Sequence, residues 1–82
     1  MRTRQQDIGD RNIVGKRVEQ RRKAINMKQK ELLEQLKVRG VELNSSGLSK
    51  LEGQLRRVMD YELVALADTL GVSINWLLGL ED

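Results

Sequence analysis

The stretch that decides the fold is Asn44-Ser45-Ser46-Gly47-Leu48-Ser49-Lys50-Leu51-Glu52-Gly53. Leu48 and Leu51 stand three residues apart, a spacing that places both on one face of a helix. Asn44 is a residue type favoured at helix N-caps, and Gly53 is typical of a helix end. The pattern predicts a short helix over residues 45–52, whose leucines face a core and whose other face is small and polar.

Two further helices are predicted before this stretch. The first begins at Asn12 as its N-cap, and its sparse apolar stripe consists of Ile13, Val14, Val18, Ala24 and Ile25. After a break at residues 26–28, the second covers residues 29–36, with Leu32, Leu33 and Leu36 at helical spacing. Gly40 and β-branched residues interrupt the period over residues 37–44, where we expect a turn with Val41 or Leu43 partly buried.

Two more helices are predicted after it. Residues 54–59 form a loop, and Asp60 is the expected N-cap of a fourth helix that ends at Gly71. The apolar stripe of this helix is Leu63, Leu66, Ala67 and Leu70. Val72-Ser73 opens a last short helix around residues 76–78. Residues 1–11 show no apolar periodicity and are expected to form a flexible basic N-terminal arm.

Length and composition limit the function. Eighty-two residues fit a single domain, here residues 12–80, and the absence of proline with only two aromatic residues favours an all-α fold. The chain contains no histidine and no cysteine, which removes the commonest general base and metal ligand and any thiolate. We therefore expect no catalytic residue, metal or cofactor, and an enzyme is the least favoured class.

Charge is distributed unevenly along the chain, although the net charge is only +3. Residues 1–30 contain ten Lys or Arg against three Asp or Glu, whereas residues 58–82 contain five acidic residues and no basic one. The asymmetry suggests one face for a polyanion and an acidic opposite end. A set of solvated helix faces explains the same charges. No apolar run approaches the roughly 18 residues of a membrane span, so we expect a soluble intracellular protein.

Four segments of the chain follow one another in a specific order and spacing. They are Gly15-Lys16-Arg17-Val18-Glu19-Gln20-Arg21-Arg22-Lys23, Met27-Lys28-Gln29-Lys30-Glu31-Leu32, Leu48-Ser49-Lys50-Leu51-Glu52-Gly53, and residues 61–73 leading into Trp76-Leu77-Leu78-Gly79. Together they resemble the Cro and phage-repressor type of helix-turn-helix regulators, also called the xenobiotic-response-element family. The resemblance covers about residues 12–80. It implies a compact five-helix, lambda-repressor-like DNA-binding domain.

The resemblance also implies which residues bind DNA. The second and third helices would form the reading unit, with the third in the major groove. Ser45, Ser46 and Lys50 then fall at base-reading positions, with Asn44 and Ser49 beside them. Expected contacts to phosphate are Gln29, Arg56 and Arg57. Arg22 and Glu52 match a pair that forms a buried salt bridge in many relatives. Plain helix capping explains Asn44, Ser45 and Ser46 without DNA, and ordinary surface exposure explains Gln29.

The resemblance further implies a transcriptional repressor that binds double-stranded DNA as a homodimer on a palindromic site, in a bacterial or phage-type cytoplasm at the nucleoid. Two features depart from the family pattern. The connection over residues 37–44 is longer than the usual tight turn, and Lys28 replaces the usual Ser or Thr cap of the second helix.

Some residues have more than one possible role. The basic residues of the first helix, namely Lys16, Arg17, Arg21 and Lys23, are expected to form a solvated face of which one or two approach DNA. Trp76, Leu77 and Leu80 fit core packing better than a dimer contact. The alternative function is a protein-interaction module, such as an antitoxin or adaptor, that uses the acidic, tryptophan-bearing C-terminal end to hold a partner.

Overall fold

Five α-helices make up the part of the chain that the computed structural model describes, residues 9–82. They are α1 (Gly15–Ala24), α2 (Gln29–Val38), α3 (Ser45–Glu52), α4 (Asp60–Leu70) and α5 (Ile74–Leu77), with no strand among the described residues. The predicted all-α, five-helix architecture is confirmed. The second helix is one half-turn longer than predicted, because it ends at Val38 and not at Leu36.

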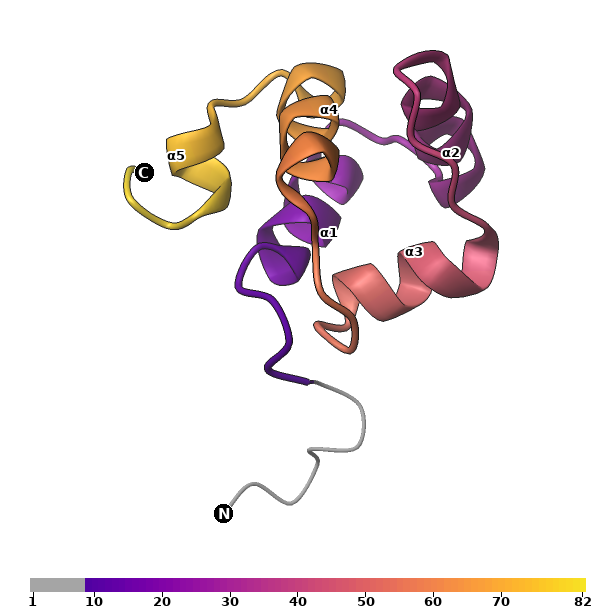
Figure 1. Ribbon diagram of the computed structural model, residues 1–82. Coiled ribbons are helices and arrows are strands. Elements are labelled where there is room, and N and C mark those ends of the chain that lie inside the picture. The colour runs from indigo at the N-terminus through magenta and orange to yellow at the C-terminus, as the bar shows by residue number, and fades with distance from the viewer. Residues whose placement is uncertain (1–8) are drawn as a thin grey trace.

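Apolar side chains from all five helices meet in one core. α1 and α4 lie in the middle of the molecule, α2 and α3 lie on one side of them, and α5 lies on the other (Figure 1). The fully buried side chains are Val18, Leu32, Leu36, Leu48, Leu51, Leu66, Leu70 and Leu77. Because each helix buries at least one of these residues, detachment of any helix from the core would expose apolar surface to water. Within residues 9–82, none of the helices combines the length and the apolar character needed to cross a bilayer.

Short polar contacts fix where the helices begin and end. The Asn44 side chain caps α3, since its Oδ1 accepts a hydrogen bond from the Gly47 amide at 2.7 Å. Ser73 caps α5 in the same way by accepting from the Trp76 amide. Gly71 ends α4 in the left-handed conformation, with φ of +69°. The Asn44 cap and the Gly71 helix end are confirmed, whereas α5 begins at Ile74, two residues before the predicted 76–78.

The starts of α2 and α4 rely on a glutamate. Asp60 was expected to be the N-cap of α4, but it is the first helical residue, and the cap position is Met59. The Glu62 carboxylate accepts from the Met59 amide at 2.9 Å. In α2, no side-chain cap comes from Lys28, and Glu31 accepts from the Lys28 amide at 2.8 Å. An acidic residue in the first turn suits the positive end of each helix dipole.

The connection between α2 and α3 is fastened to α2. It begins at Arg39, so residues 37 and 38 of the expected turn are helical. Gly40 adopts a positive φ of +86°, and the Val41 amide donates to the Leu36 carbonyl at 2.9 Å. Val41 is buried and Leu43 is half-buried. A connection with two apolar anchors holds α3 in place despite its length.

The predicted arm divides into two parts. Residues 1–8, with Arg2 and Arg4, lie outside the described residues. Of the remainder, the Gly9 amide donates to the Gly53 carbonyl at 2.8 Å and the Arg11 amide donates to the Gln54 carbonyl at 3.0 Å. The chain therefore runs beside the C-terminal end of α3 before α1 begins.

Candidate nucleic-acid interface

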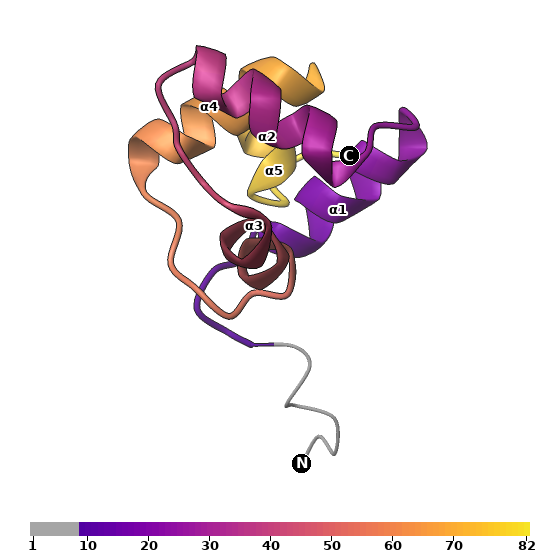
Figure 2. The same cartoon turned by 90° about the vertical axis from the view of Figure 1, so that its right-hand side faces the viewer.

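One side of α3 is free of contact with the rest of the protein. α3 lies at an edge of the molecule in two perpendicular views, and no other helix covers its outer side (Figures 1 and 2). Its inner side chains, Leu48, Leu51 and Glu52, are buried. The five residues assigned to base reading are all exposed, and they are Asn44, Ser45, Ser46, Ser49 and Lys50. The structure thus brings the whole predicted set to one accessible surface, the α3 face.

The α3 face has a centre and a flank. Ser46 and Lys50 are four residues apart and therefore lie on one line along the helix, pointing away from Leu48. Ser45 and Ser49 form a second line, which lies nearer to Glu52, because Glu52 follows Ser49 by three residues. The outermost side chains are thus a hydroxyl and an ammonium, and two further hydroxyls lie on the flank that bears Glu52.

A buried salt bridge fixes the inner side of α3. Arg22 of α1 donates from Nε to Glu52 Oε2 at 2.7 Å and from Nη2 to Oε1 at 3.1 Å. It also donates from Nη1 to the Met27 carbonyl at 3.0 Å. The hydrogen bond to Glu52 raises the pKa of Arg22 against the opposing effect of desolvation. The expected Arg22–Glu52 pair is present and joins α1 to α3.

Gln29 extends this salt bridge to α2. Its Nε2 donates to Glu52 Oε1 at 3.0 Å, and the residue is half-buried. The expected role of Gln29 was a phosphate contact, and the structure shows that the side chain also has an internal partner. An amide nitrogen carries two hydrogens, so one N–H of Gln29 remains available to a ligand.

Asn12 and Gln54 hold the C-terminal end of α3 against the start of α1. Asn12 Nδ2 donates to the carbonyls of Leu51 at 3.1 Å and Arg56 at 2.7 Å, while its Oδ1 accepts from the Gly15 amide at 2.7 Å. Gln54 Nε2 donates to the Asn12 carbonyl at 2.9 Å. Asn12 was predicted as the N-cap of the first helix, but α1 begins at Gly15 and its N-cap position is Val14. The contacts of Asn12 with α3 and the following loop were missed, because no local pattern signals them.

The two arginines of the loop after α3 differ in their surroundings. Arg56 is half-buried and forms a salt bridge with the buried Glu62, with Nη2 at 3.1 Å from Oε2 and Nη1 at 3.3 Å from Oε1. Arg57 is exposed and has no ion pair among the described residues. The sequence assigned both to phosphate contact. The structure gives Arg56 an internal role and leaves only Arg57 with an unpaired guanidinium.

The basic residues of α1 separate in the same way. Arg17 donates to the carbonyls of Trp76 at 2.6 Å and Glu81 at 2.8 Å, and its guanidinium lies 4.3 Å from the centre of the Trp76 ring. Arg21 donates to the Leu70 carbonyl at the end of α4 at 2.9 Å. Both arginines were expected on a solvated face. They instead fasten α5 and α4 to α1. Lys16 is exposed and has no ion pair in residues 9–82.

The basic side chains divide into those with an internal hydrogen-bond acceptor and those without one. Arg17, Arg21, Arg22, Arg39 and Arg56 have internal acceptors. Lys50 on the α3 face, Arg57 just after α3 and Lys16 at the start of α1 have none among the described residues, and neither have Lys28, Lys30 and Lys37 of α2 and its N-cap. Trp76 is half-buried beneath Arg17, Leu77 is buried, and Leu80 is 71% exposed, so the expected core role holds for the first two only.

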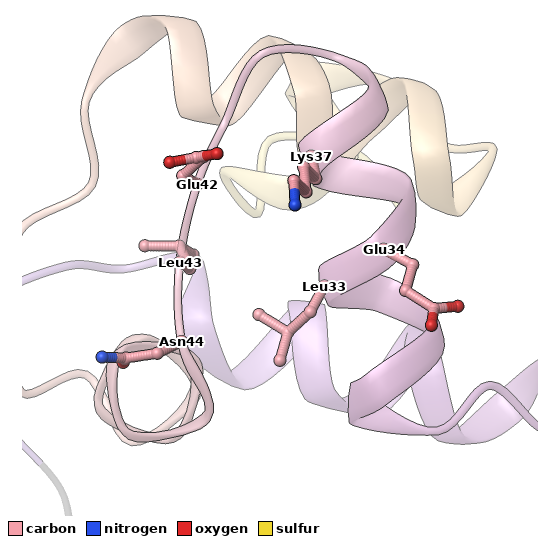
Figure 3. Close-up of a pocket in the computed structure, with 6 residues that line it drawn as sticks. All are labelled: Leu33, Glu34, Lys37, Glu42, Leu43 and Asn44. Atoms are coloured by element: carbon pink, nitrogen blue, oxygen red, sulfur yellow. The ribbon is translucent and has the colours of Figure 1, made fainter.

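Two hollows border α3. In the first, Leu33 of α2 points into the space between α2 and the connection (Figure 3). The hollow is also lined by Glu34, Lys37, Glu42, Leu43 and Asn44. The second lies where α1, α2 and α3 meet, and its volume is about 270 Å³. No metal-binding group of three or more Asp and Glu side chains occurs among the described residues.

Comparison of the chain with protein-family models, curated proteins and solved structures found no match.

Proposed function

We propose that this protein is a sequence-specific, double-stranded DNA-binding transcriptional regulator that works as a repressor. In this proposal α2, the connection and α3 act as a helix-turn-helix unit, and α3 lies in the major groove. The observation that carries the proposal is the α3 face. Five polar side chains stand exposed on a helix whose opposite side is locked to α1 and α2 through Glu52.

The dimensions and chemistry of the α3 face suit base recognition. The major groove of B-DNA is about 12 Å wide and admits one α-helix. Ser45 and Ser46 carry hydroxyls that donate to or accept from base edges, and Lys50 reaches guanine O6 or N7. Asn44 uses its Oδ1 as the helix cap, which leaves its Nδ2 as a donor for DNA. The small side chains of Ser45, Ser46 and Asn44 also allow close approach of the helix to the bases.

Rigidity supports the same proposal. A reading helix gains specificity when its orientation is fixed before binding, because less ordering free energy is spent on association. α3 is held at its N-terminal end by Val41 and the Asn44 cap, in its middle by Leu48 and Leu51, and at its C-terminal end by Asn12.

Phosphate contacts would supply most of the affinity. Arg57 is the best candidate, since it is exposed and unpaired and follows α3 closely in the chain. Gln29 contributes its second amide hydrogen beside the start of α2. Arg56 acts mainly by holding the loop through Glu62, so it supports Arg57 indirectly.

A two-fold dimer on a palindromic operator is part of the proposal, with half-sites about one helical turn apart. Such a regulator represses by occupying its site and acts in the cytoplasm at the nucleoid. The alternative, a module that binds a partner through its tryptophan-bearing end, is less well supported, since the Trp76 ring already stacks with Arg17 and is half-buried.

Titration of ¹⁵N-labelled protein with a mixed-sequence duplex of about 20 base pairs tests where DNA binds. The proposal predicts amide shift changes concentrated in residues 44–50 and around Arg57, with α5 unchanged. Changes concentrated in α5, or no changes at all at low salt, would remove the support for DNA reading by α3.

A further inference from the structure

The hollow where α1, α2 and α3 meet lies on the flank of α3 that bears Glu52. It is lined by Lys16 and Glu19 of α1, Gln29 of α2, and Ser49 and Glu52 of α3. We propose that this hollow binds one backbone phosphate of the DNA through Lys16, Ser49 and Gln29. The inference rests on the proposed function. It adds Lys16 as a phosphate ligand, and it moves Ser49, which the sequence assigned to base reading, to phosphate contact.

Charge is the first argument. Two carboxylates line the hollow, but each already has a cation. Glu19 pairs with Lys23, with Nζ at 3.2 Å from Oε2, and Glu52 is bidentate with Arg22. Lys16 is left without an ion pair among the described residues. Counted together with these two partner cations, the side chains at the hollow carry three positive and two negative charges, a surplus that suits the monoanionic phosphodiester group.

Hydrogen-bond capacity is the second argument. A phosphate oxygen accepts from ammonium, hydroxyl and amide groups. Lys16 supplies three N–H donors, Ser49 supplies one O–H, and Gln29 retains the amide hydrogen that Glu52 does not use. The bond to Glu52 also fixes the Gln29 side chain before DNA arrives. The three donors come from three different helices, so the site exists only in the folded protein.

Position relative to α3 is the third argument. When a helix lies in the major groove, a sugar–phosphate strand runs along each of its flanks. Ser49 belongs to the flank of α3 that bears Glu52, and the hollow opens on that flank. A phosphate in the hollow would set the depth and tilt of α3 while Ser46 and Lys50 face the bases. Ser49 is accordingly a phosphate ligand and not a base reader.

The test compares Lys16→Ala with Lys37→Ala on one duplex over a range of salt concentrations. Both variants remove one exposed positive charge, but Lys37 lies at the other end of α2, about 12 Å along the helix from Gln29. Lys16→Ala should weaken binding about fivefold at 150 mM salt. It should also make the negative slope of log K against log salt shallower by about one unit. Lys37→Ala should leave the slope unchanged.

A chemical probe locates the phosphate. Single methylphosphonate linkages, which remove one phosphate charge, are placed along each strand of the duplex. At one position, the linkage should weaken DNA binding by the wild type. In the Ser49→Ala variant, the combined loss of binding should be smaller than the sum of the two separate losses. The same linkage should cause no further loss of binding in Lys16→Ala. Equal effects of every linkage on wild type and Lys16→Ala, or equal slopes for both lysine variants, would overturn the phosphate site. If instead the wild type itself shows no salt-dependent binding, the proposed DNA-binding function fails as a whole.

Discussion

Gly15 and Leu51 place α1 and α3 in direct backbone contact. A Cβ atom added to Gly15 would lie 2.0 Å from the Leu51 carbonyl oxygen, a distance that side chains do not reach without movement of the backbone. The same carbonyl accepts from Asn12 Nδ2 at 3.1 Å. The position of the proposed reading helix thus depends on the absence of a side chain at one position of α1.

The first prediction follows from this contact. Gly15→Ala should destabilise the protein by about 1–3 kcal/mol or more, because α3 must move away from α1. The result is informative because alanine is the better helix former by about 1 kcal/mol and would raise the stability of an unconstrained helix. Gln20→Ala, at an exposed position of the same helix, should change stability by less than about 0.5 kcal/mol. Thermal unfolding of both variants checks this, and an unchanged or higher melting temperature for Gly15→Ala would contradict the close contact.

The second prediction concerns the buried salt bridge. Arg22→Ala should cost about 3–5 kcal/mol, because the Glu52 carboxylate is left buried without its cation. Arg39→Ala removes a more exposed pair with Asp68 and should cost at most about 1 kcal/mol. Urea unfolding of the two variants measures the difference, and equal losses would show that burial of the Arg22–Glu52 pair has no energetic consequence.

The raised pKa of Arg22 also determines how the stability difference between wild type and Arg22→Ala depends on pH. The pKa of Arg22 is raised in the folded protein, so its charge contributes stability below its ordinary pKa, and this is lost only as the pH rises through the raised value. The stability difference between wild type and Arg22→Ala should therefore stay constant from neutral pH to about pH 11. A difference that falls across this alkaline range would show that another group is responsible.

The third prediction separates two neighbouring arginines. Arg57→Ala should weaken binding to all duplexes alike and reduce the salt slope by about one unit, with little change in melting temperature. Arg56→Ala should instead lower stability by about 1–3 kcal/mol, since the buried Glu62 loses its cation. Binding isotherms and melting curves for both variants give the comparison. A reduced salt slope without destabilisation for Arg56→Ala would reverse these roles.

The fourth prediction concerns base recognition. Lys50→Ala should cost about 1–3 kcal/mol on the preferred duplex and much less on other sequences, because a groove contact discriminates between bases. Competition assays with single base-pair changes reveal the position at which preference is lost. Equal weakening on every sequence would make Lys50 a phosphate contact.

Much of the fold could be predicted from local patterns. The leucines of α2 and α3, the Asn44 cap and the Gly71 helix end depend on residues within a few positions of one another, and all are as expected. The α3 face was also predicted, because the buried positions of a helix determine which residues remain exposed.

The errors share a physical cause. Arg17 and Arg21 were predicted as surface charges, but they donate to main-chain carbonyls at the ends of α5 and α4. Because every residue has a main-chain carbonyl, no residue type in the sequence marks these acceptors. Asn12 and Gln54 are 42 residues apart, and Gln54 adopts a positive φ of +63° that glutamine does not signal. Contacts from a side chain to a distant backbone depend on tertiary placement and leave no periodic trace in the sequence.

Selection of bound duplexes from a random-sequence DNA pool at about 150 mM salt tests the central proposal most directly, because purely electrostatic binding is already weak at this concentration. The proposal predicts enrichment of a palindrome whose half-sites are about one helical turn apart, and loss of that enrichment in a Ser46→Ala, Lys50→Ala double variant that melts like the wild type. Recovery of DNA without any enriched sequence, or the same enriched palindrome from the double variant, would contradict base reading by α3.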